Sequence, residues 1–321
     1  MSDIDRFSYL LDKINCSEIE DNPFPHISIE GFFKSNDFEE IILSKQIGLK
    51  TVKSDQELFD ELFANGYDIV PFPGAITNYK EYMAWHGGKK NSLEHHSACE
   101  AAGIVLRLNK PSTPILNQLK LFINSEEFNL AISKKFNVNL QECNRDSGIQ
   151  KYLDGYEISP HPDLRKKALT FMVNINPSRD SENATYHTHY LKFTKSKQYV
   201  SEYWKGNPMV ERCWVPWEWC STVKQQIKNN SIVIFSPSHC TMHAVKAEYQ
   251  HFNGQRTQLY GNIWYEKKFQ ESESRLDWWD FDLQAHRENQ NKKGLKSIIN
   301  SAYWRLREDK NKVDKSRRHN Y

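Results

Sequence analysis

The spacing of apolar positions divides the chain into a mainly helical first half and a strand-rich second half. Apolar residues recur at helical intervals in residues 55–64, 92–107, 113–123 and 126–135. Ser112-Thr113-Pro114 and Ser125-Glu126-Glu127 precede the last two segments, and such residues favour helix N-termini. In NPFPHISIEGFF (22–33), prolines followed by alternating apolar residues predict a turn and a short strand, after which Ser35 is expected to cap a helix.

From about residue 149, short segments rich in β-branched and aromatic residues replace the helical pattern. They are IQKYLDGYEIS, KALTFMVNIN, THYLKF, SIVIFS, MHAVKAE and TQLYGNIWY, separated by Gly, Pro, Asn and Ser. Many short strands in succession are typical of an antiparallel sandwich or barrel of the jelly-roll kind. The sequence therefore predicts an α+β fold in which a double-stranded β-helix (a cupin-like jelly roll) packs against a helical N-terminal half.

We expect one domain over residues 1–321, because neither an internal repeat nor a low-complexity linker interrupts the sequence. Within this domain, residues 1–148 are the mainly helical support and residues 149–266 are the β-helix core. An aromatic-rich insertion is expected at 192–230, and a helical or tail-like segment at 267–321.

Composition and charge narrow the class of protein without naming a function. The 43 basic and 41 acidic side chains nearly cancel to +2, too weak a field for a dedicated nucleic-acid binder or a polybasic membrane anchor. Six scattered cysteines include no CxxC pair, which favours a reducing compartment over a disulfide framework. The sequence shows no signal-peptide pattern and no apolar run of membrane-spanning length. We therefore expect a soluble cytoplasmic protein, whose oligomeric state the sequence does not set.

Metal-binding residues stand at the end of one predicted strand and at the start of another. His161 and Asp163 are two positions apart, so their side chains project to the same side of an extended backbone. The best third ligand is His243, eighty residues further on. Its rival His239 sits in a Pro-Ser turn, whereas His243 begins a strand. Two histidines and one carboxylate on one face of an octahedron form the facial triad of non-haem Fe(II) oxygenases.

Arg256 has the chemistry that such a site needs for a co-substrate. The triad leaves positions open for a 2-oxo acid, which chelates the metal through its carboxylate and keto oxygens and whose distal carboxylate needs a bidentate cation. Arg256 lies 13 residues beyond His243, one predicted strand later. The two side chains can therefore meet inside a barrel.

At these residues the sequence resembles the 2-oxoglutarate/Fe(II)-dependent dioxygenases, and more narrowly their prolyl-4-hydroxylase-like branch. That branch carries Tyr–x2–Gly–x5–His–x–Asp, then His-x-Val, and then Gly-x-Arg/Lys on the following strand. The corresponding residues here are Tyr152, Gly155, His161 and Asp163, then His243-Ala244-Val245, then Gly254-Gln255-Arg256. The match covers about residues 149–266, and the NPFPHISIEGFF segment also looks like an N-terminal strand of the family.

The resemblance implies a catalytic site with iron held by His161, Asp163 and His243, with 2-oxoglutarate and O2 as co-substrates and ascorbate as a further candidate cofactor. It places Tyr152 and Asn174 near the 2-oxoglutarate carboxylate that Arg256 binds, and Asn262 is a secondary candidate for the same pocket. The carboxylate of Asp163 implies hydroxylation, because related halogenases have Gly or Ala there. The chain departs from the family at Tyr186–Leu191, where a Gly-Gly-x-Leu strand usually follows, so the family does not imply a substrate.

Several candidate residues also have a structural interpretation. Tyr152 and Asn174 fit as barrel filling, and Arg256 as the partner of a surface acid. His95-His96 is expected to be exposed, and His187 and His189 are expected to have a substrate-side or structural role rather than to bind iron. The aromatic residues of 186–219, Trp217 among them, predict either a packing cluster or a lid over the iron.

The function favoured by the sequence is hydroxylation of a C–H bond in a small molecule such as an amino acid, a sugar or a natural-product intermediate. One alternative is a protein prolyl-type hydroxylase of the same chemistry. Another is a cupin-like metal enzyme without 2-oxoglutarate, which would have no use for Arg256. The third is a non-catalytic binding protein on the same scaffold.

Overall fold

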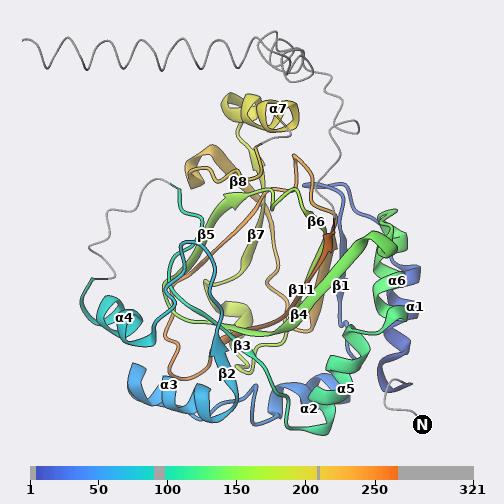
Figure 1. The fold of residues 1–321 in the computed structure, drawn as a ribbon. Coiled ribbons are helices and arrows are strands. Elements are labelled where there is room, and N and C mark those ends of the chain that lie inside the picture. The colour runs from blue at the N-terminus through green and yellow to red at the C-terminus, as the bar shows by residue number, and fades with distance from the viewer. Residues whose placement is uncertain (1–4, 90–97, 208–209, 267–321) are drawn as a thin grey trace, which may run out of the picture. The chain divides into compact units, whose positions relative to one another are not determined.

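Two antiparallel sheets form the core of the computed structural model, which describes residues 5–89, 98–207 and 210–266 (Figure 1). The larger sheet has the order β1-β9-β6-β11-β4-β3-β2 and the smaller one β5-β10-β7-β8. The strands are β1 (Ile27–Glu30), β2 (Tyr67–Ile69), β3 (Val105–Leu108), β4 (Cys143–Tyr152), β5 (Tyr156–His161), β6 (Lys167–Asn174), β7 (Thr188–Phe193), β8 (Cys220–Gln225), β9 (Ser231–Phe235), β10 (His243–Ala247) and β11 (Arg256–Tyr265). Residues of both sheets line one cavity, so the sheets face each other as a double-stranded β-helix, and the predicted fold class is confirmed.

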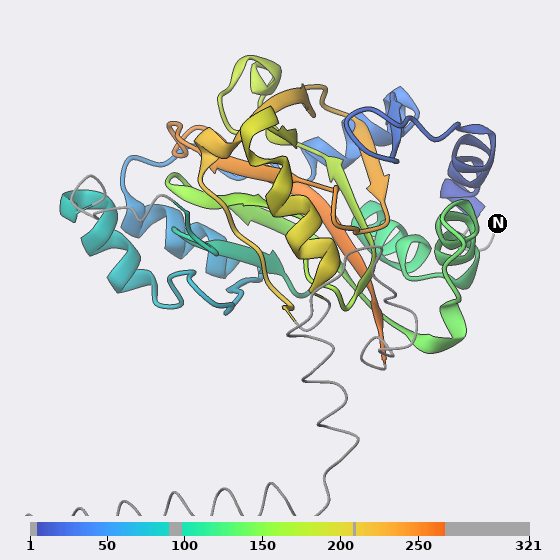
Figure 2. The same cartoon turned by 90° about the horizontal axis from the view of Figure 1, so that it is seen from above.

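The helices between residues 9 and 135 pack against the outer face of the larger sheet (Figures 1 and 2). The later helix α7 instead lies beside the smaller sheet, where Val200 packs near Leu191 and Ala244. The α-helices are α1 (Tyr9–Cys16), α2 (Ser35–Leu43), α3 (Asp55–Ala64), α4 (Tyr79–Ala84), α5 (Pro114–Ile123), α6 (Glu126–Lys135) and α7 (Gln198–Gly206). The shorter helical turns are η1 (Asp5–Phe7), η2 (Trp85–Lys89), η3 (Leu140–Glu142), η4 (Ser181–Asn183), η5 (Lys195–Lys197) and η6 (Trp217–Trp219). None of the helices in these described ranges combines the length and apolarity needed to cross a membrane.

Strict alternation along the central strands separates the apolar core from the cavity. Leu169, Phe171 and Val173 of β6 join the apolar cluster that packs against the helices. Met172, between them in sequence, faces the cavity instead. Because successive side chains of a strand point to opposite faces, one strand can supply both an apolar packing surface and a functional one.

Four of the five predicted helices are confirmed, as α2, α3, α5 and α6. Two of these helices begin with a side-chain cap: Ser54 accepts a hydrogen bond from the Glu57 amide at 3.3 Å, and Ser125 accepts one from the Phe128 amide at 3.2 Å. Thr113, which precedes α5, forms no side-chain cap hydrogen bond. Ser35 is different, because α2 begins at this residue and Lys34 precedes it without a side-chain cap.

The prediction of a helix at 92–107 is wrong for residues 98–107, the part of this range that the structure describes. Residues 98–104 are not helical, and Val105–Leu108 forms β3 between β2 and β4. Gly103 has a positive φ of 70°, and a Cβ there would lie 2.7 Å from the Gly155 carbonyl oxygen, so the chain makes a close backbone contact at this point. Pairing with distant strands overrides the local helical pattern. The expected segment 267–321 lies outside the described residues.

A buried lysine on β4 leads to a testable pH dependence of stability. The Lys151 ammonium donates to the Ile47 carbonyl at 2.8 Å and to Thr257 Oγ1 at 2.9 Å, and burial lowers its pKa from 10.5 to about 7. Between these two pKa values the unfolded chain binds more protons than the folded one, so stability should rise with pH by up to about 1.4 kcal/mol per unit. Lys151→Met should remove this slope, measured by urea unfolding at about pH 7 and about pH 9.

The matched control for this prediction is Lys45→Met, at an exposed lysine. Its slope should equal that of the unmodified chain. If Lys151→Met keeps the slope as well, the buried ammonium is not its source.

Candidate metal centre

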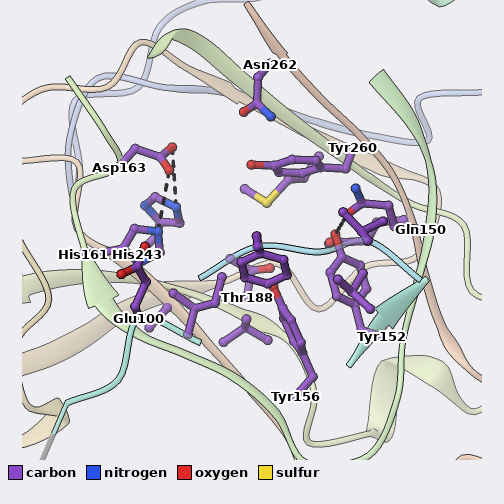
Figure 3. Close-up of a pocket in the computed structure, with 18 of the residues that line it drawn as sticks. Glu100, Gln150, Tyr152, Tyr156, His161, Asp163, Thr188, His243, Tyr260 and Asn262 are labelled. Atoms are coloured by element: carbon purple, nitrogen blue, oxygen red, sulfur yellow. Dashed lines mark hydrogen bonds and ion pairs between the residues drawn. The ribbon is translucent and has the colours of Figure 1, made fainter. Parts of the chain in front are cut away.

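His161 and His243 lie directly opposite each other on neighbouring strands. β5 and β10 pair antiparallel with His243 in register with His161, and the two ring centroids are 4.2 Å apart. Asp163 follows β5, with its carboxylate 3.6 Å from His161 Nε2 and 3.8 Å from His243 Nε2 (Figure 3). Each residue is only 7% exposed. The fold thus brings the three predicted metal ligands together.

Hydrogen bonds fix both imidazoles in the form that binds a metal. His161 Nδ1 lies 2.9 Å from the Ser159 carbonyl oxygen, and His243 Nδ1 lies 2.9 Å from the Thr241 carbonyl oxygen. A carbonyl only accepts, so each Nδ1 carries a proton, and in the neutral ring each Nε2 offers its lone pair. Burial, with a further contribution from His161, lowers the pKa of His243 to about 3, which keeps its ring neutral.

Asp163 is held as a carboxylate by a cation and a hydroxyl group. The Lys167 ammonium donates to Oδ1 at 2.5 Å, and Thr170 Oγ1 donates to Oδ2 at 2.9 Å. Burial alone would raise the pKa of Asp163, but the Lys167 charge lowers it well below its usual range. The Asp163 backbone has a φ of 72°, an uncommon conformation for a residue other than glycine and one found at functional sites. The set of two imidazoles and one ionised carboxylate fits Fe(II).

Arg256 lies in the same cavity, at the start of β11. It stands opposite Tyr152 of β4, and its guanidinium carbon is 4.5 Å from the centroid of the Tyr152 ring. Nη2 donates to Thr188 Oγ1 at 2.9 Å. The residue is 3% exposed, and within the described ranges it forms no ion pair. A buried guanidinium without a carboxylate is poised to bind one from a ligand.

The cavity that holds these groups measures about 280 Å³ (Figure 3). Its walls include His161, Asp163, His243, Arg256, Tyr152 and Asn262, together with Gln150, Lys167, Thr188, Gln258, Tyr260, Trp214 and Trp264. Asn174 does not line it, because its amide donates to the Gln226 and Lys228 carbonyls at 2.9 and 3.1 Å. The predicted contact of Asn174 with a co-substrate stays a prediction, as does that of Asn262.

Lys167, Thr188 and Tyr260 belong to the site but were not found by sequence reasoning. Strand alternation could have identified Tyr260, since Arg256, Tyr260 and Asn262 share one face of β11. Lys167 and Thr188 gave no such signal: Lys167 acquires its role from Asp163, four residues earlier across the turn into β6, and Thr188 from Arg256, 68 residues later.

The other histidines lie away from this cavity as far as the structure describes them. His189 Nδ1 contacts Thr222 Oγ1 at 2.9 Å, and neither His187, His189 nor His239 is among the cavity residues. His95 and His96 are outside the described residues.

The predicted insertion at 192–230 contains α7, which sequence reasoning did not foresee, and β8. Trp214 lines the cavity with its ring nearly parallel to that of His161, at an angle of 18° and a centroid distance of 5.9 Å. Trp217 instead donates to Glu157 at 2.8 Å and is not among the cavity residues. The lid hypothesis stays a prediction.

No protein-family model matches this chain, and no curated protein does. Among solved structures, a Pseudomonas putida prolyl-4-hydroxylase matches with 8% identity over 81% of this chain and 98% of its own, at a TM-score of 0.40. A prolyl hydroxylase from Trichoplax adhaerens matches with 10% identity over 86% and 94%, at 0.37. HygX from Streptomyces hygroscopicus matches with 9% identity over 82% and 87%, at 0.33. Likeness at this level is weak and assigns no function to this chain.

Proposed function

We propose that this protein is a non-haem Fe(II), 2-oxoglutarate-dependent oxygenase that hydroxylates a C–H bond of a small molecule. The observation that carries the proposal is a buried arginine without an ion-pair partner in the described residues, in the same cavity as a His-Asp-His triad. One oxygen atom of O2 would enter the substrate hydroxyl group. The other would enter the succinate that forms as 2-oxoglutarate loses CO2.

His161, Asp163 and His243 would hold the iron, which supplies the site for O2 activation when bound. Lys167 and Thr170 each hydrogen-bond one oxygen of Asp163, which fixes the orientation of this ligand. Arg256 would bind the distal carboxylate of 2-oxoglutarate, with Thr188 holding its guanidinium and Tyr152 packed against it. Asp163 would serve as a metal ligand where related halogenases have Gly or Ala, so hydroxylation is favoured over halogenation.

A small-molecule substrate is favoured by the cavity itself. Its volume of about 280 Å³ is near the lower end of ligand sites, and aromatic side chains such as Phe72, Trp214 and Trp264 line it. A protein prolyl-type hydroxylase is the alternative within the same chemistry. A reducing cytoplasm suits both Fe(II) and the six free cysteines, and ascorbate would serve to keep the iron reduced.

The decisive test is anaerobic titration of the purified protein with Fe(II) and 2-oxoglutarate. The chelate should produce a weak visible charge-transfer band, and admission of O2 should then release succinate. Candidate substrates are expected to shift the band and to increase succinate formation. If the protein binds iron but neither forms the band nor releases succinate, the cupin-like alternative without 2-oxoglutarate is favoured.

A further inference from the structure

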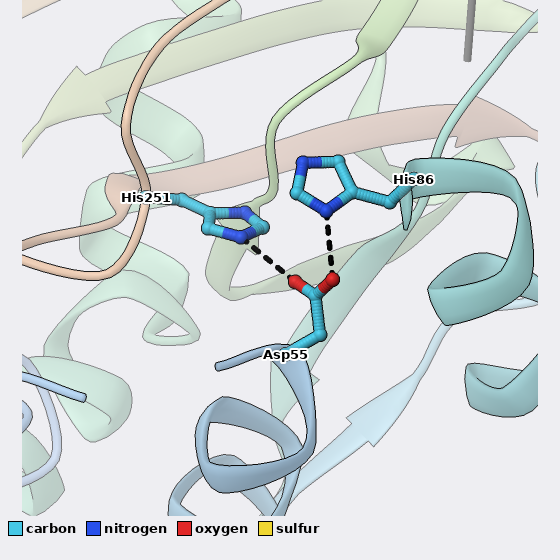
Figure 4. Close-up of side chains that lie close together, drawn as sticks. All are labelled: Asp55, His86 and His251. Carbon is cyan, nitrogen blue, oxygen red and sulfur yellow. Dashed lines mark hydrogen bonds and ion pairs between the residues drawn. The ribbon is translucent and has the colours of Figure 1, made fainter. Parts of the chain in front are cut away.

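A second group of titratable side chains, which we call the His–Asp cluster, consists of Asp55, His86, Asp154 and His251. Asp55 begins α3, His86 lies in η2, Asp154 lies in the turn between β4 and β5, and His251 lies between β10 and β11. His86 Nδ1 is 2.7 Å from Asp55 Oδ2, and His251 Nε2 is 3.0 Å from Asp55 Oδ1 (Figure 4). His86 Nε2 is 2.9 Å from Asp154 Oδ2.

The hydrogen bonds of this cluster argue against a metal site, although two histidines and an aspartate converge. His251 Nδ1 accepts a hydrogen bond from the Asp154 amide at 3.1 Å, so in the neutral ring Nε2 carries the proton and has no lone pair to offer. Both nitrogens of His86 meet carboxylates, which only the doubly protonated ring can satisfy by donation. The two imidazoles also face different oxygens of Asp55 (Figure 4).

The cluster is connected to the predicted 2-oxoglutarate pocket through Asp154 and Tyr249. Asp154 Oδ1 accepts a hydrogen bond from the Tyr249 amide at 2.8 Å. The Tyr249 hydroxyl donates to the Tyr152 carbonyl and accepts from the Arg256 amide, the latter at 2.9 Å. Tyr152 and Arg256 are opposite each other on β4 and β11, so this hydroxyl ties together the two strands that present them.

We propose that His86 is a positioning residue for the 2-oxoglutarate pocket, acting through Asp154 and Tyr249 on the backbone of Tyr152 and Arg256. This inference rests on the proposed function. His86 is well placed for the task because it also bonds Asp55 and stacks on Tyr82, with ring centroids 5.4 Å apart and an angle of 9°. The Tyr82 hydroxyl in turn donates to the Asp154 carbonyl at 2.7 Å, so η2 and α4 both hold the β4–β5 turn.

The titratable groups that face His86 are Asp154, Asp55, His251 and Tyr82. Hydrogen bonds to Asp154 and then Asp55 raise the pKa of His86 from 6.5 to about 9. Burial alone would raise the pKa of Asp55, but the hydrogen bonds with His251 and His86 lower it to about 2. Because the folded-state pKa of His86 is raised, its contribution is complete below the unfolded value and is lost as pH rises through about 9.

The test compares His86→Gln with Asn78→Ala in the whole 321-residue chain. Asn78 caps α4 by accepting from the Lys80 amide at 2.9 Å, so its loss weakens the start of the helix next to η2 and removes no hydrogen bond of the cluster. His86→Gln should raise KM for 2-oxoglutarate by roughly 2- to 30-fold with a smaller change in kcat, whereas Asn78→Ala should leave KM unchanged. In the unmodified chain, KM should rise as pH passes about 9 towards the value of His86→Gln, whose own KM stays flat.

Amide hydrogen exchange tests the same connection without any co-substrate. Exchange at Tyr249 and Arg256 should be faster in His86→Gln than in the unmodified chain and unchanged in Asn78→Ala. Absence of 2-oxoglutarate binding in the unmodified chain would overturn the proposed function, while unchanged exchange in His86→Gln would overturn this inference alone. The inference would also be overturned if the His243→Ala variant bound one equivalent of metal and the double variant His243→Ala, His86→Gln bound none. The cluster would then be a metal site. A flat KM profile across pH 9 in the unmodified chain counts against the inference even if His86→Gln does not fold.

Discussion

Replacing His243 with alanine is expected to remove tightly bound Fe(II) and to lower 2-oxoglutarate-dependent turnover by more than about 100-fold. Loss of an outer hydrogen-bond partner of a metal ligand already costs about 10- to 100-fold, and loss of a ligand should cost more. His243 is in register with His161 and 3.8 Å from Asp163, so no other side chain of β10 is placed to replace it. Iron content after gel filtration and succinate release are the two measurements.

His239→Ala is the matched control, because this histidine is four residues earlier in the chain and is not among the cavity residues. It should keep both iron and turnover. Iron retained in His243→Ala would remove His243 from the metal centre, and iron lost in His239→Ala would return His239 as the rival ligand.

The sequence was informative where a local rule determines the geometry. His161 and Asp163 follow from the alternation of a strand, and the register of β5 with β10 then places His243 opposite His161. Most of the strands from 149 onward could also be predicted, because turn residues mark their ends. β4 is longer than predicted, since its first residues from Cys143 are held by pairing with β11 rather than by a strand-like sequence.

The sequence was less informative where contacts between distant segments decide the outcome. Val105–Leu108 joins the larger sheet because β2 and β4 pair with it, although the local pattern resembles a helix. Asn174 shares the inward face of β6 as its parity predicts, yet the carbonyls of Gln226 and Lys228 engage its amide. Such partners come from loops whose path the sequence does not encode in any periodic pattern.

Arg256 is buried and has no ion-pair partner in the described part of the chain. Its guanidinium donates a hydrogen bond to Thr188, and the Tyr152 ring adds a cation–π contact. A buried cation that lacks an anion costs stability, so a site of this kind is maintained for its ligand. The same residue should therefore lower the stability of the ligand-free protein and raise its affinity for a dicarboxylate.

Arg256→Met is expected to weaken 2-oxoglutarate binding by at least about 30-fold, the cost of removing one partner of a buried charge pair at about 2 kcal/mol. Without ligand, the same variant should unfold with an unchanged free energy or one raised by about 1–2 kcal/mol, because the unpaired charge is gone. Isothermal titration with 2-oxoglutarate in the presence of a redox-inert divalent metal measures the first quantity. Urea unfolding of the metal-free protein measures the second.

Two further arginine variants separate charge from geometry. Arg256→Lys keeps the charge but not the two-pronged donor, so it should bind 2-oxoglutarate more weakly than the unmodified chain and gain no stability. Arg107→Met removes a guanidinium of the same cavity that already pairs with Asp146 at 2.6 Å, so it should gain no stability either. If Arg256→Met instead destabilises the ligand-free protein and leaves 2-oxoglutarate affinity intact, Arg256 is a structural residue. The 2-oxoglutarate site would then lie elsewhere in the cavity, or the proposed use of 2-oxoglutarate would be wrong.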